Sequence, residues 1–390
     1  MRGNWHSFNY TIGVMALKQS TPTLADLDPD ALAERFAAWG YKPGHAARVL
    51  RAFYAGREVV PEDVQLPQGL VGRLRNEFHS RAANLAARQV AADGTMKLLL
   101  RLADGRTVES VLMPDYRPDR AAGCISSQVG CAMGCDFCAT TKTGFERNLT
   151  AGEIVEQFLA LRREAQAVGR KLQTVVFMGM GEPLLNLEAV LTAVHRLADH
   201  SLGAFGWRQI TVSTVGIVPG MDALTATGLN FNLAVSLHAP DDATRARLLP
   251  MGERFLIADI LAAADRFQAV RGRPVTIQYC LLAGVNDSPA QARQLAGWLV
   301  NRRMHVNLLR YNPTGLSLQG VAYRPTPDAA AEAFVAVLRE HKVVAHFRRP
   351  RGPEIDAACG QLRRRALEAA PTPLPSSVPA ALLAHPDEST

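Results

Sequence analysis

Three cysteines stand close together in the run GCAMGCDFCAT, directly after a short β-rich stretch. Cys131, Cys135 and Cys138 have the spacing CxxxCxxC, in a position where α/β folds gather their active sites. Thiolates are the usual ligands of iron-sulfur clusters, and three of them leave one iron of a cubane open. An open iron can chelate the amino and carboxylate groups of S-adenosylmethionine (SAM). The spacing therefore predicts a 4Fe-4S cluster that passes one electron to SAM and yields a 5′-deoxyadenosyl radical.

Two other kinds of metal site fit these cysteines less well. A structural zinc ion needs a fourth Cys or His nearby, and no histidine occurs between Ser80 and Val194. An electron-transfer ferredoxin supplies four thiolates to each cluster, but the next cysteine, Cys124, lies upstream at an unsuitable spacing. The pattern favours the SAM-binding cluster over both.

Polar residues follow several other short β-rich runs. Glu182, in MGMGEP, follows glycines that allow close backbone approach, and its carboxylate can accept bonds from an ammonium group such as that of SAM. Ser213 lies in VSTVG, Ser236 and His238 lie in VSLHAP, and Asn312 lies in RYNPTG. Such groups suit the recognition of ribose, carboxylate and adenine. Each alone is typical of an ordinary turn, but their recurrence at strand ends indicates one shared site.

The elements that position these residues alternate between strand and helix patterns. The β-rich runs are one that leads to Gly123, TVVFMG from Thr174, QITVST from Gln209, FNLAVSL from Phe231, VTIQYCLL from Val275 and HVNLLR from His305. This alternation implies parallel strands joined by right-handed crossovers. About six units fit, fewer than a closed eight-unit barrel needs. We therefore predict an α/β fold with a partial (βα)6 barrel, whose open side would admit a macromolecular substrate.

Smaller units flank this barrel. Helical patterns around GYKPG predict a small N-terminal helical accessory region in residues 1–92. MKLLLRLADGRTVESVLM alternates in period two around Asp104, which predicts a β-hairpin extension within 93–119. The barrel and a C-terminal segment then occupy 120–367. The end of the chain, 368–390, is rich in Pro, Ser and Ala and is predicted to be a disordered tail.

Size, charge and cysteine use exclude some classes of protein. The chain has 390 residues, 48% of them hydrophobic, and a formal net charge of +7, which suits a polyanionic partner without requiring one. No apolar run approaches the roughly 20 residues that span a bilayer, and no convincing signal peptide is present. Four of the six cysteines lie between Cys124 and Cys138, and such a group is typical of metal binding or thiol chemistry in a reducing compartment. We expect a cytoplasmic monomer without membrane contact.

Longer stretches of the sequence resemble one known family. They are CISSQVGCAMGCDFC, GFERNLT, MGMGEPLLN, VSTVGIVP, LAVSLHAP, GVNDS, VNLL with the following NP, and RGPEIDAACGQL. Together they are similar to the successive signatures of the RlmN/Cfr family of radical SAM RNA methyltransferases. The match runs from about Glu109 to Leu362. The N-terminal helical unit also resembles the small accessory domain of that family.

This resemblance implies roles for individual residues. The three cysteines of CxxxCxxC would hold the 4Fe-4S cluster. Cys359, in AACGQL, matches the cysteine that is methylated during turnover, and Cys124, in CISSQ, matches the thiol that later forms a disulfide with it. Glu109, in VESVLMP, matches a carboxylate assigned as a proton acceptor. The positions that match the SAM-binding residues are Gly181, Glu182, Ser213, Ser236, Leu237, His238 and Asn312.

The resemblance also implies a reaction in which the protein carries the transferred carbon. One SAM methylates the Cys359 thiolate, and a second yields the radical that removes a hydrogen from the S-methyl group. The carbon radical adds to carbon 2 of an adenine, which is too electron-poor for plain methylation. Proton loss and attack of Cys124 on the linking sulfur free the product and leave a disulfide. An electron donor and thiol reductant is therefore an implied partner.

The implied substrates are an adenosine of 23S rRNA and, as a further target, an anticodon-loop adenosine of tRNA. Phosphate contacts are predicted for Arg348, Arg349, Arg351, Arg363 to Arg365, Lys142 and Arg147. An adenine edge becomes reachable only when the base is unstacked or flipped, which favours a loop nucleotide. Cys280 falls in a predicted buried strand and is assigned to the core.

Three other interpretations remain open from the sequence. An enzyme of the same family that methylates carbon 8 would use the same cysteines. A SAM-cleaving activase or maturase would act on a protein and leave Cys359 unmethylated. An iron-sulfur RNA-binding regulator would release no deoxyadenosine. The segments RYNP, TTKTGF and PMGERF depart from the usual pattern of the family, which bears on substrate choice and leaves the cysteines intact.

Overall fold

The computed structural model describes residues 23–55, 65–78, 81–348 and 351–362. Within these residues, the main feature is a ten-stranded sheet in the order β1-β2-β3-β4-β7-β8-β9-β10-β11-β12. Its parallel strands are β4 (Arg120–Cys124), β7 (Lys171–Phe177), β8 (Ile210–Thr214), β9 (Asn232–Ser236), β10 (Val275–Leu281), β11 (Met304–Arg310) and β12 (Val344–Arg348). A small separate sheet pairs β5 (Gln128–Gly130) with β6 (Phe145–Asn148).

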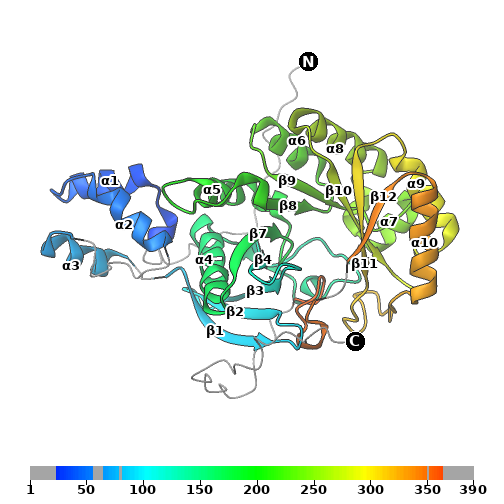
Figure 1. Ribbon diagram of the computed structural model, residues 1–390, viewed down its shortest axis with the longest axis horizontal. Helices are drawn as coiled ribbons and strands as arrows, with labels where there is room; N and C mark the ends of the chain where they lie inside the picture. The colour runs from blue at the N-terminus through cyan, green and yellow to red at the C-terminus, as the bar shows by residue number, and fades with distance from the viewer. Residues whose placement is uncertain (1–22, 56–64, 79–80, 349–350, 363–390) are drawn as a thin grey trace, which may run out of the picture.

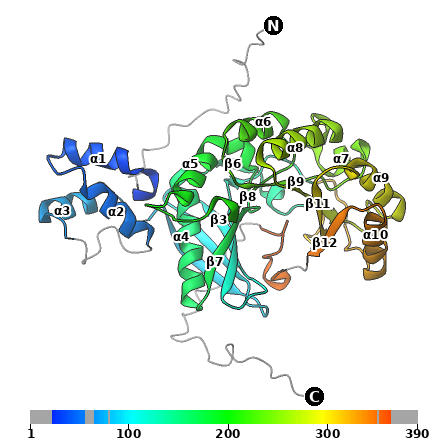
Figure 2. The same ribbon diagram turned by 45° about the horizontal axis from the view of Figure 1, so that its top comes forward.

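Helices cover the outer side of the curved parallel sheet (Figures 1 and 2). They are α4 (Ala151–Ala167), α5 (Leu187–Ala198), α6 (Val218–Ala226), α7 (Asp242–Leu248), α8 (Ile257–Arg271), α9 (Pro289–Leu299) and α10 (Asp328–Glu340). No pairing joins β1 to β12 in the described ranges, so the barrel is open. The predicted partial barrel is confirmed, with one addition. Strand β12 pairs in parallel with β11 and was not predicted.

An antiparallel extension precedes the barrel. It consists of β1 (Ala83–Val90), β2 (Met96–Leu102) and β3 (Thr107–Pro114), and β3 pairs with β4. The predicted hairpin around Asp104 is present as β2 and β3, and Gly105 takes a φ of +83° in its turn, a conformation that favours glycine. Strand β1 is a further difference, because it lies inside the range 1–92 for which only helices were predicted.

The N-terminal helices form a unit that projects from one end of the barrel (Figures 1 and 2). They are α1 (Pro29–Ala38), α2 (His45–Tyr54) and α3 (Gln68–Glu77). Their shared core includes fully buried Phe36 and Leu50. The preceding 3-10 turn, η1 (Leu24–Asp26), is held by Arg196 of α5, whose guanidinium donates to the carbonyls of Ala25 and Asp26 at 2.7 and 2.8 Å. This contact anchors the helical unit to the barrel.

The last described segment, 351–362, lies on the inner side of the sheet (Figure 1). It is held by backbone contacts to two loops. The Ala139 N–H donates to the Gly360 carbonyl at 2.7 Å, and the Thr140 hydroxyl donates to the Leu362 carbonyl at 2.6 Å. The Asn312 amide reaches the Cys359 carbonyl at 3.5 Å. These contacts place Cys359 beside the loop of three cysteines. The predicted tail, 368–390, lies outside the described residues.

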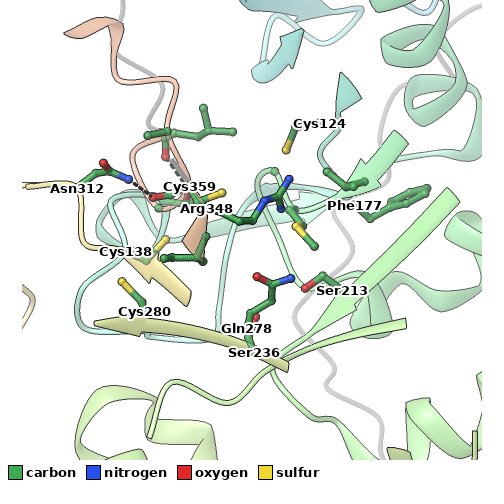
Figure 3. Close-up of a pocket in the computed structure, with 18 of the residues that line it drawn as sticks. Cys124, Cys138, Phe177, Ser213, Ser236, Gln278, Cys280, Asn312, Arg348 and Cys359 are labelled. Atoms are coloured by element: carbon green, nitrogen blue, oxygen red, sulfur yellow. Dashed lines mark hydrogen bonds between the residues drawn. The ribbon is translucent and has the colours of Figure 1, made fainter. Parts of the chain in front are cut away.

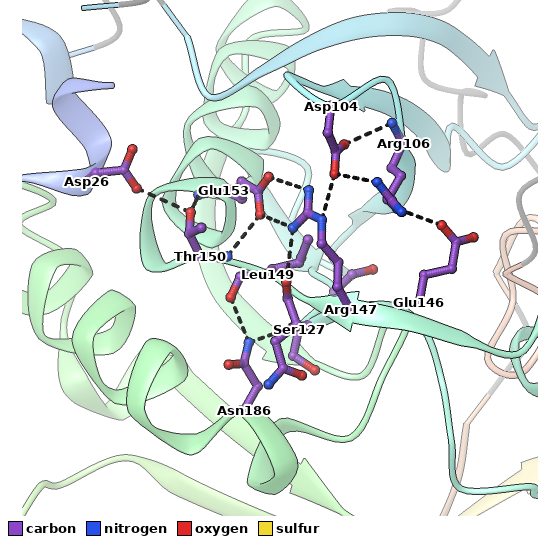
Figure 4. Close-up of polar contacts among 12 residues, drawn as sticks. Asp26, Asp104, Arg106, Ser127, Glu146, Arg147, Leu149, Thr150, Glu153 and Asn186 are labelled. Atoms are coloured by element: carbon purple, nitrogen blue, oxygen red, sulfur yellow. Dashed lines mark hydrogen bonds and ion pairs between the residues drawn. The ribbon is translucent and has the colours of Figure 1, made fainter. Parts of the chain in front are cut away.

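A partly buried ionic network joins the β-hairpin to α4 (Figure 4). Arg147 donates through Nε to Asp104 at 2.7 Å and through both terminal nitrogens to Glu153 at 2.8 Å. The same Glu153 carboxylate accepts from the Thr150 N–H and closes a capping box at the start of α4. Only 17% of the Arg147 side chain is exposed. Arg147 therefore links two structural elements, and its guanidinium is already fully engaged within the protein.

Replacing Arg147 with alanine is expected to lower the free energy of unfolding by about 2 kcal/mol, because it removes the charged partner of the buried Glu153 carboxylate and one of the two arginines that contact Asp104. The matched control is Arg106→Ala. Arg106 also contacts Asp104, but 37% of its side chain is exposed, so its loss should cost less than about 1 kcal/mol. Chemical denaturation of the two variants measures both values. Equal losses would show that the buried network adds nothing beyond a surface ion pair.

Candidate active site

One large cavity lies on the inner side of the parallel sheet and has a volume of about 660 Å³. It brings together side chains from β4, from the loop of three cysteines, from the ends of the later strands and from segment 351–362 (Figure 3). The predicted site residues that line it are Cys124, Cys131, Cys135, Cys138, Gly181, Glu182, Ser213, Ser236, His238, Asn312 and Cys359. Leu237 and Glu109 do not line this cavity in the described structure.

The cysteine loop is held mainly through its backbone, and its three thiols form no disulfide. The Thr141 hydroxyl donates to the carbonyls of Cys135 and Cys138 at 3.1 and 2.9 Å. The Asp136 N–H donates to the Leu248 carbonyl at 2.9 Å, and its carboxylate accepts from the Tyr323 hydroxyl at 2.7 Å. Cys131, Cys135 and Cys138 are all free cysteines. The loop therefore presents three thiols to the cavity from a fixed backbone.

The chemistry of these thiols fits a cluster better than a single ion. Burial raises the pKa of Cys131 to about 12 and raises the pKa of Cys135 as well, and the neighbouring thiols add to the rise. Binding a metal centre would therefore deprotonate them. Within the described residues, no three His, Cys, Asp or Glu side chains come close enough to bind one metal ion. A cubane binds each thiolate to a different iron, so it requires wider separation than a mononuclear site.

Glu182 projects into the cavity from the end of β7. Gly181 before it has a φ of +96°, and a side chain there would overlap with Gln128, which explains the glycine. The Glu182 carboxylate accepts from the N–H groups of Val215 and Leu184 at 2.8 and 3.1 Å. Burial raises the pKa of Glu182 to about 7, although these hydrogen bonds oppose the rise. A buried carboxyl that is half ionised at neutral pH is well suited to an ammonium group.

His238 is held in one orientation by its neighbours. Its Nδ1 accepts from the Cys280 N–H at 2.9 Å, so the proton of the neutral ring is on Nε2. Burial, followed by the charge of Arg245, lowers the pKa of His238 to about 3. Its backbone has a φ of +56°, a strained value for a residue other than glycine. His238 is therefore a neutral hydrogen-bond donor at the edge of the cavity.

Cys124 and Cys359 come from opposite ends of the barrel sequence and line the same cavity (Figure 3). Burial raises the pKa of Cys124 to about 12, and burial also raises the pKa of Cys359. Arg348, at the end of β12, lines the cavity, and its positive charge lowers the pKa of both thiols, against the effect of burial. Cys359 is surrounded by protein atoms, but part of its surface faces the open cavity, so it is accessible. Both thiols are free.

Glu109 lies on β3, close to these thiols on the sheet. Val111 pairs with Cys124, and residues two apart on a strand share a face, so Glu109 faces the same side as Cys124. Its carboxylate forms an ion pair with Lys97 of β2 at 3.3 Å and is 3% exposed. Lys97 also reaches the Asp356 carbonyl at 3.5 Å. The pair therefore lies beside the segment that carries Cys359.

The structure adds cavity residues that the sequence analysis missed or assigned elsewhere. Gln278 of β10 is 3% exposed and has a side-chain carbonyl without a hydrogen-bond partner in the described structure. Cys280, assigned to the core, is buried and also lines the cavity near Cys138 and Cys359. Both residues lie in the mostly apolar run VTIQYCLL. Their side chains differ from their neighbours' in facing the cavity, and the sequence alone does not show which face of the strand that is.

The cations predicted to contact phosphates fall into three groups. Arg348 and Arg351 line the cavity. Arg147 and Lys142 have intramolecular partners, since the Lys142 ammonium donates to the Thr314 carbonyl at 2.7 Å. Arg349 and residues 363–365 lie outside the described residues. No helix among the described residues is long and apolar enough to cross a membrane.

Comparisons with known proteins agree with this site. Residues 125–296 match the radical SAM superfamily. The chain is 72% identical over 345 residues to a probable dual-specificity RNA methyltransferase RlmN 1 of Opitutus terrae, across 88% of this chain and 97% of the relative. It is 44% identical over 336 residues to a probable dual-specificity RNA methyltransferase RlmN of Rhodopirellula baltica, across 86% of this chain and 89% of that one.

A solved structure has the same architecture. The crystal structure of a radical SAM methyltransferase from Sphaerobacter thermophilus matches with a TM-score of 0.82 and 40% identity, over 88% of this chain and 99% of that one. Enzymes of this kind use a 4Fe-4S cluster and SAM. The chain belongs to the RlmN family of radical SAM RNA methyltransferases.

Proposed function

We propose that this protein methylates carbon 2 of an adenosine in 23S rRNA and of an adenosine in tRNA, with Cys359 as the carrier of the methyl group. One observation supports this most strongly. Cys124 and Cys359 line a single cavity together with the three-cysteine loop and the polar strand ends. A methyltransferase that passes the SAM methyl group directly to its substrate needs neither of these thiols. RNA as the substrate class is supported by the names of the relatives.

In this proposal Cys131, Cys135 and Cys138 hold the 4Fe-4S cluster. SAM is bound by Gly181, Glu182, Ser213, Ser236, Leu237, His238 and Asn312. When bound, the cluster and SAM supply a 5′-deoxyadenosyl radical. The Glu182 carboxylate accepts hydrogen bonds from the amino group of SAM, and His238 donates from Nε2. The Leu237 side chain is fully buried, so this residue acts through its place in the backbone.

The protein's own groups then carry out the transfer. The Cys359 thiolate accepts a methyl group, and its carbon later becomes bonded to the adenine. Glu109 accepts the proton that the base loses. The Cys124 thiol attacks the sulfur of Cys359 and gives its proton to the released carbon, which breaks the sulfur-carbon bond and frees the methylated base. The unpaired electron of the adduct would pass to the oxidised cluster, and a disulfide remains. A thiol reductant must then reduce the disulfide. Arg348 and Arg351 supply phosphate contacts at the cavity.

SAM binding is expected to depend on pH through Glu182. Its pKa is raised to about 7, and the ionised carboxylate accepts hydrogen bonds from the amino group of SAM more strongly than the neutral carboxyl group does. Affinity should therefore be full above pH 8 and fall about tenfold by pH 6, as the ionised fraction falls. Equilibrium SAM binding to the cluster-loaded protein measures this profile. Glu182→Gln should bind weakly with a flat profile. A flat profile in the unchanged protein would contradict the assignment of Glu182.

The function is tested by mass spectrometry of nucleosides from 23S rRNA and tRNA of cells that lack this protein and of cells that re-express it. We expect 2-methyladenosine to return in both RNAs with the intact protein. Appearance of 8-methyladenosine would assign the protein to carbon 8 instead. If neither nucleoside changes, the RNA substrate is wrong and a protein substrate becomes the alternative to test.

A further inference from the structure

Arg245, on α7, is a fully buried cation that none of the steps above uses. It is 1% exposed, and it has the largest volume of the fully buried side chains in the described structure. Its guanidinium donates to the carbonyls of Ser236 at 3.1 Å, of Leu237 at 2.7 Å, and of Val215. Its Nε has no partner in the described residues. All its hydrogen bonds therefore go to neutral groups.

A buried cation of this kind needs a counter-charge. The described residues contain no ion pair between Arg245 and a carboxylate. The nearby Asp242 carboxylate accepts from the Ile257 N–H instead. Burial lowers the pKa of Arg245 to about 10, so the guanidinium is still charged at neutral pH. Asp242 attracts the guanidinium without forming an ion pair with it, so a charge this deeply buried is only partly compensated. This indicates that a further anion, absent from the protein itself, completes the site.

The position of Arg245 identifies that anion. The Val215 carbonyl accepts from Arg245, while the Val215 N–H donates to Glu182 at 2.8 Å. Helix α7 also supports the cysteine loop, because the Leu248 carbonyl accepts from the Asp136 N–H. Leu248 and Phe137 share one apolar cluster. Arg245 therefore contacts the ends of β8 and β9 on one side, and on the other it lies close enough to Cys135 for the two charges to interact.

We propose that Arg245 is the buried counter-charge of the iron-sulfur cluster, and that it positions the ends of β8 and β9 for SAM while raising the reduction potential of the cluster. This inference rests on the proposed assignment of the three cysteines. Three thiolates give the oxidised cluster a net negative charge. One electron from an external low-potential donor makes it one unit more negative. A fixed positive charge nearby stabilises the reduced form more than the oxidised form.

The test compares the intact protein with Arg245→Gln and Arg245→Lys, each as the full chain loaded with iron and sulfide under anaerobic conditions. Redox titration followed by electron paramagnetic resonance gives the midpoint potential. We expect a shift to more negative potential in R245Q, which keeps donors for the carbonyls and loses the charge. We expect R245K to keep the potential of the intact protein and to bind SAM about tenfold more weakly, because it loses carbonyl contacts.

An R245Q protein with full iron content and an unchanged potential would overturn the proposal. If R245Q fails to bind the cluster, R245K decides. It keeps the charge, so a midpoint potential clearly more negative than that of the intact protein, at full iron content, would overturn the proposal. A failure of the intact protein to bind a cluster is a different result. It would contradict the assignment of Cys131, Cys135 and Cys138 instead.

Discussion

Replacing Cys359 with alanine is expected to reduce RNA methylation by on the order of 10³-fold or more, because it removes a group that takes part covalently. Cluster content and SAM binding should persist, since Cys359 lies on segment 351–362 and not on the three-cysteine loop. The segment is held through its backbone carbonyls and not through the Cys359 thiol. Transfer of a labelled methyl group from SAM to RNA measures the loss.

The chain offers a matched control in Cys280→Ala. Cys280 is a second thiol in the same cavity, buried on β10 near Cys138 and Cys359, but the proposal gives it no chemical role. Its replacement should leave RNA methylation within about threefold of the intact protein, since a small apolar side chain replaces a thiol of similar size. If Cys280→Ala abolished transfer and Cys359→Ala did not, the two assignments would have to be exchanged.

Replacing Cys124 with alanine is expected to give a different defect, which is a covalent complex between protein and RNA. The carbon bonded to Cys359 can still reach the adenine, but no thiol remains to attack the linking sulfur. Cys124 is 7% exposed and lines the cavity, so solvent thiols cannot easily replace it. Denaturing electrophoresis with labelled RNA should show most of the active protein retarded as a complex, and product release should fall at least about a hundredfold.

The double variant Cys124→Ala, Cys359→Ala is the control for this experiment. It lacks the carrier and should form no complex. Free methylated RNA from Cys124→Ala at the rate of the intact protein would show that Cys124 does not release the product. A complex in the double variant would show that the bond forms at another residue.

The parts of the site that could be predicted are those encoded in short runs of sequence. The three-cysteine loop and the residues at strand ends follow from local patterns, because parallel strands direct their carboxyl ends to one edge of the sheet. The hairpin of β2 and β3 follows from alternation around Asp104. Strands β1 and β12 were missed because the apolar residues of ANLAARQV and VAHFR do not alternate regularly with polar ones, which is the pattern that indicates a half-buried strand. Both strands are largely exposed or half-buried.

Contacts between distant segments could not be predicted from patterns. The joint placement of Cys124 and Cys359 depends on how segment 351–362 folds back over the sheet, and only the family resemblance suggested it. Arg245 lies in DDATRARL, a charged run typical of an exposed helix face, yet its side chain is fully buried. Its role depends on carbonyls at the ends of β8 and β9, which precede Arg245 in the chain. No local spacing in the sequence predicts these contacts.

The central claim, that Cys359 carries the methyl group, is tested most directly by an isotope experiment with a single turnover. Protein whose Cys359 already carries an unlabelled methyl group is mixed with RNA and SAM bearing a trideuterated methyl group, and the first product is analysed by mass spectrometry. The account predicts an adenine methyl group whose carbon comes from the protein, without the label of the added SAM. A first product that carries the deuterated methyl group would contradict it, because the carbon would then have passed from SAM to RNA without Cys359.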